Sequence, residues 1–298
     1  MLTIGLIDYL NTQPFQHSLA KRLTGKDVRF ARGVPTTLNR ALVAGEVDLA
    51  PISAIEAARH AEDVVILPGL SIASLGAVKT VLLFSWKPDP LELAGQPIAL
   101  TDHSATSVAL LKLLFRERYE AGADWRTRPQ NLAAMMSECQ AALVIGDTAL
   151  VEASQHRMLI TPSGETARPY VFDLGDEWLK HTGLPFVFAL WAARKATLPE
   201  LLALDIPQAL HDSTGDGLAA IDTLATAYAP RLGLPVGVCA RYLRDLRYSL
   251  TDWDLQGLNT YLDSALGKDR QPLEFLEFIG TQTLAPAPSA GVNADKRR

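Results

Sequence analysis

The chain has 298 residues, of which 48% are hydrophobic and 20% charged, a composition typical of a globular protein with one or two α/β units. Its formal net charge is -5 and its basic residues are dispersed, which argues against a nucleic-acid partner. No apolar run approaches the ~18 residues of a membrane span, and no secretory leader is visible, so we expect a cytoplasmic protein without a membrane partner.

Short apolar runs alternate with helical periodicity through the first two-thirds of the chain, which predicts parallel βαβ units. Strands are expected at Leu2–Ile7, at Val47–Ala50 (ended by Pro51), and at Ile66–Leu70, Val78–Trp86, Ile98–Leu100, Ala142–Ile145 and Phe186–Ala192. Helices are expected at Pro14–Leu23, Ser53–His60, Ser104–Tyr119 and Asp147–Ser154. From Leu198 onward the apolar spacing predicts helices only. The fold class is therefore α/β with a helical C-terminal region.

Two crossings between lobes are expected, near residues 85–97, where prolines and glycines gather, and near residues 183–192. The chain is predicted to divide into the first part of lobe 1 (1–87), lobe 2 (88–185), the return to lobe 1 with the C-terminal helices (186–280) and a flexible tail (281–298). This order is typical of two-lobed binding proteins, which hold a ligand at strand ends and close around it.

Three predicted helix starts follow strand ends and carry polar side chains. The first holds Tyr9 and Asn11, whose amide can both donate and accept, as a carboxylate or hydroxyl ligand requires. A turn-forming role for Asn11 is the alternative. The second holds Ser53, which forms a capping box with Glu56 by spacing, so helix capping alone would explain it.

The third helix start has three hydroxyl residues, Ser104, Thr106 and Ser107. Ser104 is a suitable N-cap, but the other two exceed what capping needs. Hydroxyls and N–H groups that converge at a helix N-terminus can hold an anion without a cation. We therefore predict a small-anion site in the cleft, with this turn as its strongest element.

Other polar residues near strand ends are weaker candidates. Thr80 lies on a predicted strand and Asp147, after Gly146, could be a simple N-cap. Cys139 and Cys239 are far apart and fit free thiols. The sequence has no catalytic triad pattern, no glycine-rich phosphate loop and no metal-binding motif, so neither a metal nor a cofactor is expected.

Five segments, in order along residues 3–280, also carry a family pattern. They are YLNTQP (Tyr9–Pro14), GEVDLAPISAIE (Gly45–Glu56), HSATSVALLKLLF (His103–Phe115), LVIGDTAL (Leu143–Leu150) and DLGDEWLKHTGLPFVFALWAAR (Asp173–Arg194). Together they resemble the chorismate dehydratase family of the futalosine route to menaquinone, and the last segment is the most specific.

The resemblance implies a periplasmic-binding-protein-like (type II) fold and a hydro-lyase that converts chorismate to 3-[(1-carboxyvinyl)oxy]benzoate and water without a cofactor. It places Asn11 and Thr80 at catalytic positions. The substrate-binding positions that it implies are Tyr9, Ser53, Ser104, Thr106, Ser107, Gly146 and Asp147. Thr80 stands where the family commonly has serine, and Gln13 and Ala105 also depart from the family pattern. The alternatives are 1,4-dihydroxy-6-naphthoate synthase of the same pathway and a non-catalytic cytosolic carboxylate sensor.

Overall fold

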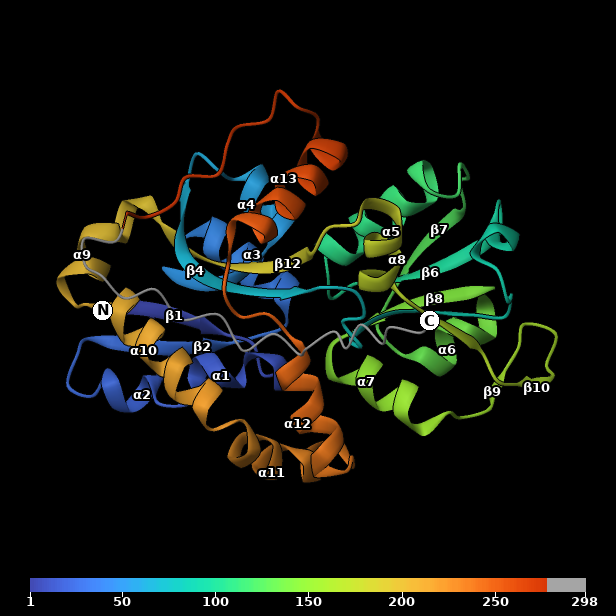
Figure 1. The fold of residues 1–298 in the computed structure, drawn as a ribbon, viewed down its shortest axis with the longest axis horizontal. Helices are drawn as coiled ribbons and strands as arrows, with labels where there is room; N and C mark the ends of the chain where they lie inside the picture. Colours follow the sequence, from blue (N-terminus) through green and yellow to red (C-terminus); the bar gives the residue numbers. More distant parts are fainter. Residues whose placement is uncertain (278–298) are drawn as a thin grey trace, which may run out of the picture.

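The computed structural model describes residues 1–277 and contains two five-stranded sheets, so the α/β class is confirmed. The first sheet has the order β2 (Val28–Arg32), β1 (Leu2–Leu6), β3 (Leu49–Ser53), β12 (Phe186–Arg194) and β4 (Val64–Ser74). The second has the order β11 (Tyr170–Asp173), β5 (Val81–Ser85), β8 (Ala141–Ile145), β6 (Pro97–Thr101) and β7 (Asp124–Arg128). We call the bodies built on these sheets the first and second lobes, which Figure 1 shows side by side. The expected tail at 281–298 lies outside the described residues.

Helices cover both sheets. Those before β12 are η1 (Leu10–Thr12), α1 (Gln13–Gln16), α2 (Leu19–Arg22), α3 (Pro35–Ala44), α4 (Ala54–Arg59), η2 (Pro90–Leu93), α5 (Thr106–Glu117), α6 (Leu132–Glu138), α7 (Gly146–Gln155) and α8 (Leu174–Thr182). Those after β12 are η3 (Lys195–Thr197), α9 (Leu198–Ala203), α10 (Ile206–Ala219), α11 (Ile221–Leu232), α12 (Val236–Asp245) and α13 (Asp252–Leu266). A short hairpin, β9 (Leu159–Ile160) and β10 (Thr166–Ala167), forms a separate two-stranded sheet.

The central strands are buried on both faces, as their continuous apolar sequences require. Every residue of β1, β3, β5 and β8 is buried. Strand β3 runs through Pro51, where the sequence analysis ended it. It does so because β1 pairs with β3 at Leu49 only, so no neighbour on that side needs the N–H group that proline lacks.

The first crossing between the lobes lies at residues 75–80, not at 85–97 as the breaker residues suggested. Strand β5 pairs with β8 and β11 of the second sheet, so it belongs wholly to the second lobe. The predicted boundary at residue 87 therefore falls after β5 instead of before it. The breaker-rich stretch forms η2 and its flanking turns within the second lobe.

Asp173, the first residue of the DLG segment, joins the first crossing to the start of α8. Its carboxylate accepts hydrogen bonds from the backbone N–H groups of Val78 and Lys79, at 3.0 and 2.6 Å. The same carboxylate caps α8 by accepting from Gly175. A side chain on Gly175 would lie 2.4 Å from the carbonyl oxygen of Gly76, so only glycine fits there. The most specific segment of the sequence thus fixes the chain just before Thr80.

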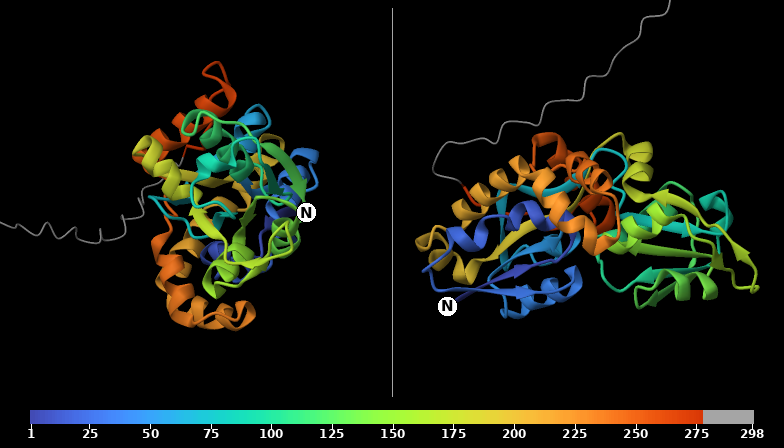
Figure 2. Two further views of the ribbon diagram at one scale, coloured as in Figure 1. Left: turned by 90° about the vertical axis from the view of Figure 1, so that its right-hand side faces the viewer. Right: turned by 90° about the horizontal axis from the view of Figure 1, so that it is seen from below.

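The C-terminal helices pack along the first lobe (Figure 2). Helix α10 packs on α1 and α2, and α12 contacts η1. Helix α13 lies between β12 and α5 and so reaches the second lobe as well. There the Tyr261 hydroxyl donates to the Thr106 carbonyl oxygen at 3.1 Å.

Candidate active site

One pocket opens between the lobes, with an empty volume of about 570 Å³ that includes its open mouth. Its polar lining consists of Tyr9, Asn11, Thr12, Ser53, Thr80, Ser104 and Ser107. The rest of the lining is Ile7, Pro35, Pro51, Ile52, Ile72, Val78, Val81, Ile145, Gly146, Phe188 and Ala189. Seven of the nine predicted site residues thus meet in one pocket, and Thr106 and Asp147 do not line it.

The turn after β1 brings Tyr9 and Asn11 to the pocket. The Thr12 hydroxyl lies 2.6 Å from the carbonyl oxygen of Ile7 and 2.8 Å from that of Tyr9, which fixes the turn. Asn11 is half-buried, and its Oδ1 atom is buried without a hydrogen-bond partner within residues 1–277. A buried acceptor that is unpaired in a cleft suits a ligand that donates a hydrogen bond.

Tyr9 closes one side of the pocket. Its burial, together with the nearby Asp147 and Asp102 carboxylates, raises the pKa of Tyr9 to about 12. The phenol is therefore protonated at neutral pH and can only donate to an anion. Gly146 packs against its ring with a φ of +66°, and a side chain there would lie 2.8 Å from the ring.

Ser53 does not form the capping box that its spacing suggested. Its side chain makes no capping hydrogen bond to α4. Instead, Asn39 holds the residue from both sides: its Nδ2 group donates to the Ser53 hydroxyl at 3.0 Å, and its Oδ1 atom accepts from Ser53 N–H at 3.1 Å. Ser53 therefore lines the pocket in a fixed orientation.

Thr106 supplies the missing cap and, unlike Ser104 and Ser107 of the same turn, does not line the pocket. Its hydroxyl accepts from the Ile55 N–H group at 3.2 Å, so it caps α4 from the other lobe. The side chain is 1% exposed and turned away from the pocket lining. Sequence spacing alone missed this because the partner is 51 residues away.

Ser104 and Ser107 form the part of this turn that faces the pocket. Ala105, not the predicted Ser104, is the N-cap residue of α5. The Ser104 hydroxyl still accepts from Ser107 N–H at 3.1 Å and donates to the Ser107 hydroxyl at 2.9 Å. This order of donors leaves the hydroxyl proton of Ser107 for a ligand. Helices α3, α5 and α7 all begin at the pocket, so their positive N-terminal ends favour an anion there.

Thr80 lies where the first crossing enters β5. Its hydroxyl is 2.9 Å from that of Tyr242 on α12, a residue that the sequence analysis did not single out. Its carbonyl oxygen accepts from Gly146 N–H at 2.8 Å, which ties the crossing to the start of α7.

Asp147 is the second predicted site residue that does not line the pocket. Its Oδ1 atom accepts from Leu10 N–H at 2.9 Å, which joins α7 of the second lobe to η1 of the first. Burial raises the pKa of Asp147 to about 6, although hydrogen bonds from Leu10 and Tyr228 oppose the shift. Asp147 thus links the two lobes beside the pocket.

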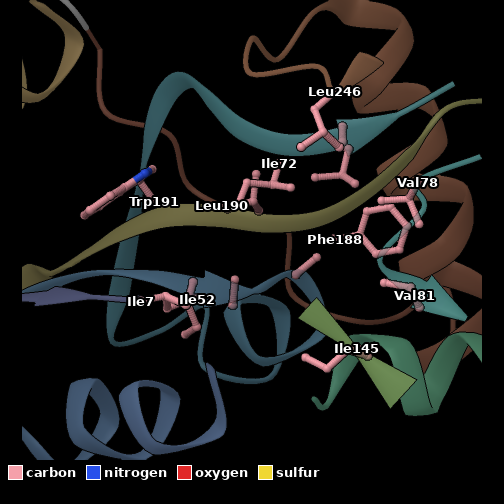
Figure 3. Close-up of a cluster of buried hydrophobic side chains, with 14 of the residues drawn as sticks. Ile7, Ile52, Ile72, Val78, Val81, Ile145, Phe188, Leu190, Trp191 and Leu246 are labelled. Atoms are coloured by element: carbon pink, nitrogen blue, oxygen red, sulfur yellow. The ribbon is translucent and has the colours of Figure 1, made fainter. Parts of the chain in front are cut away.

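Apolar side chains form the other walls, and Figure 3 shows Phe188 of β12 pointing toward Val78 and Val81. The pairing of β12 with β4 shifts register between Val187 and Ala189, so Phe188 sits at a bulge. Bulges turn a side chain out of the regular alternation and are frequent at binding sites. No charged side chain is among the residues that line the pocket.

Three further features concern thiols, membrane spans and metal-binding groups. Cys139 and Cys239 are buried free thiols, as predicted. Within residues 1–277, no helix is long and apolar enough to cross a membrane, and no group of three His, Cys, Asp or Glu side chains is placed to hold a metal ion.

The comparisons with known proteins agree with this architecture. A family model described as menaquinone biosynthesis matches residues 2–266. The chorismate dehydratase of Thermus thermophilus is 37% identical over 280 residues, which cover 92% of this chain and 98% of that protein.

Two solved structures with low sequence identity share the fold. A protein of Archaeoglobus fulgidus superposes with a TM-score of 0.65 at 18% identity, covering 90% of this chain and 97% of its own. The periplasmic aliphatic sulphonate binding protein of Escherichia coli superposes with a TM-score of 0.58 at 16% identity, covering 96% and 97%. The predicted periplasmic-binding-protein-like fold is thereby confirmed.

Proposed function

Because this chain belongs to the menaquinone-biosynthesis family, whose model spans residues 2–266, we propose that it is a chorismate dehydratase. Its product would be 3-[(1-carboxyvinyl)oxy]benzoate plus water, which makes it a hydro-lyase, and we place it in the cytoplasm. The observation that carries the proposal is the pocket itself: neutral hydrogen-bonding groups and helix starts converge opposite apolar walls. Such a lining suits a flat ring that bears carboxylates.

The reaction depends more on the orientation of the substrate than on a strong catalytic acid or base. The C–H bond at ring C3 breaks, its electron pair enters the ring, and the C4 hydroxyl leaves as water after it gains a proton. Since the ring becomes aromatic, the product side is strongly favoured. The protein must hold the substrate in a reactive conformation, exclude water and direct protons.

The lining restricts which group takes the C3 proton. Tyr9 is the one lining side chain that titrates, and its raised pKa of about 12 keeps it protonated. The carboxylate of Asp147 is bound to Leu10 N–H and lies outside the lining. We therefore assign the role of base to the carboxylate of the substrate's own enolpyruvyl group, which is tethered near C3 through one oxygen atom.

The remaining roles follow from donor and acceptor chemistry. Ser53, Ser104 and Ser107 would hold the carboxylates by hydroxyl donors at helix starts. Asn11 and Thr80 would contact the reacting side of the ring, where the leaving hydroxyl donates and accepts hydrogen bonds. Thr106 and Asp147 would act only by fixing the lobes around the pocket.

The test is incubation of the purified protein with chorismate in the presence of EDTA and without added cofactor. We expect an aromatic product with a carboxyvinyl ether, identified by mass and by ultraviolet absorbance. Activity that requires an added divalent metal would contradict the cofactor-free proposal. Chorismate that binds but is recovered unchanged would support the sensor alternative instead.

A further inference from the structure

A fully buried tyrosine on a C-terminal helix contacts the two candidate catalytic side chains without lining the pocket. Tyr242 of α12 is 1% exposed and is not among the residues that line the pocket. Its hydroxyl lies 2.9 Å from the Thr80 hydroxyl. It also interacts with the Asn11 side chain: burial raises the pKa of Tyr242, whereas hydrogen bonding with Thr80 and Asn11 lowers it.

The order of donors along this contact can be worked out. The Thr80 hydroxyl donates to the Val78 carbonyl oxygen at 3.4 Å, so its proton is not directed at Tyr242. In the 2.9 Å contact between the two hydroxyls, Tyr242 is then the donor and the Thr80 oxygen accepts.

This order decides what Thr80 can offer to a ligand. With its oxygen occupied by the Tyr242 donor, Thr80 keeps its proton for another acceptor. Within the protein the available acceptor is the Val78 carbonyl oxygen at 3.4 Å, which is too far for a strong bond. A substrate oxygen in the pocket would be a better acceptor, and Thr80 would donate to it.

Tyr242 also contacts two short pieces of chain that lie outside the sheets, and it holds both side chains against one helix. Asn11 lies on the short helix η1, and Thr80 lies on the crossing between the lobes, next to Lys79 with its φ of +66°. Neither is held by regular pairing at that point, whereas Tyr242 sits within the ten-residue helix α12. Contacts to a rigid, buried group restrict the rotamers of side chains that must be aligned with a reacting bond.

We propose that Tyr242 is a positioning residue for the dehydration, which sets the hydrogen-bond direction of Thr80 and the placement of Asn11 without touching the substrate. The inference rests on the proposed function, because it concerns the same pocket and reaction.

The first test compares Tyr242→Phe with the matched control Tyr248→Phe. Tyr248 is also buried, at 4% exposure, but its hydroxyl has no hydrogen-bond partner within residues 1–277. We expect Tyr242→Phe to lower kcat on chorismate by about 10- to 100-fold with KM changed by less than about 3-fold, because orientation is lost and binding is kept. The control should keep both constants within about 2-fold of wild type.

The second test asks whether Tyr242 acts through Thr80. In a Thr80→Val background, Tyr242→Phe should have little further effect, whereas in Thr80→Ser, which keeps the hydroxyl, its effect should persist. Assays well below the melting temperature of the least stable variant keep the comparison valid if Tyr242→Phe is destabilised.

Three results would overturn the inference: a wild-type kcat in Tyr242→Phe, an equal loss in Tyr248→Phe, or a loss that persists in full in the Thr80→Val background. Each leaves the proposed function intact if the wild-type protein turns over chorismate. Absence of turnover in the wild-type protein would instead refute the proposed function, and the inference with it.

Discussion

Thr106→Val provides a sharp test of the site, because it separates a hydroxyl that caps a helix from one that binds a ligand. Valine keeps the shape of threonine and replaces the hydroxyl, which can donate and accept, with a methyl group. The Ile55 N–H group, which lies 3.2 Å from that acceptor, would lose its partner. Both residues are 1% exposed, so water cannot replace the lost bond.

The expected loss follows from the burial of the orphaned group. Leaving a buried donor unpaired costs about 1–3 kcal/mol. A chain of 298 residues unfolds with an entropy of about 0.6 kcal/mol/K near its melting point, so this loss lowers Tm by about 2–5 °C. Binding of chorismate or its product should change little, because Thr106 does not line the pocket.

Ser107→Ala is the matched variant, one position along the same helix. Its hydroxyl lines the pocket and accepts from Ser104 at 2.9 Å. Loss of a hydrogen bond to a carboxylate is worth about 1.5–3 kcal/mol, which weakens binding by about 10- to 150-fold. Thermal unfolding and titration calorimetry on both variants measure the two effects separately. If Thr106→Val weakened binding as Ser107→Ala does, at an unchanged Tm, the assignment of Thr106 as a cap would be wrong.

Three further predictions concern the pocket and the contact between the lobes. Asn11→Ala should lower kcat by at least about 100-fold if its amide stabilises charge that develops during the reaction, and a near-normal kcat would return Asn11 to a turn-forming role. Gly146→Ala should raise KM strongly, because the new methyl group would lie 2.8 Å from the Tyr9 ring. Gly95→Ala is the control, since Gly95 has a similar φ of +70° and no atom within 4 Å of the added methyl group. It should lower the free energy of unfolding by only the backbone cost of about 1–2 kcal/mol. Asp147→Asn should alter the pH dependence of the free energy of unfolding, because folding raises the pKa of Asp147 from 3.8 to about 6. Protonation of Asp147 therefore stabilises the folded protein below about pH 4, and this stabilisation is lost as the pH rises through 6. The change is about 3 kcal/mol, and the asparagine variant should lack it. Urea unfolding of both proteins at pH 4.5 and 7.5 should capture about 2 kcal/mol of this change, and an equal difference between the two proteins at both pH values would contradict the prediction.

Local sequence patterns determined much of the architecture. The continuous apolar runs of β1, β5, β8 and β12 predicted buried strands, since a strand covered on both faces has no polar side. Polar residues after strand ends predicted a pocket at helix starts. Seven of the nine predicted site residues line that pocket. Strands with mixed burial were missed: β2 and β7 have exposed positions and charged residues, so their local pattern resembles a loop.

What the sequence by itself determined is therefore the succession of buried strands and helix starts, because hydrophobic periodicity and capping act over a few residues. Only the tertiary structure decided the direction of each polar side chain, since that depends on partners far along the chain. Thr106 faces Ile55 across 51 residues and Asp147 faces Leu10 across 137, and neither lines the pocket. Tyr242 reaches Thr80 across 162 residues, and no local pattern marks a residue whose role arises from a contact of that span.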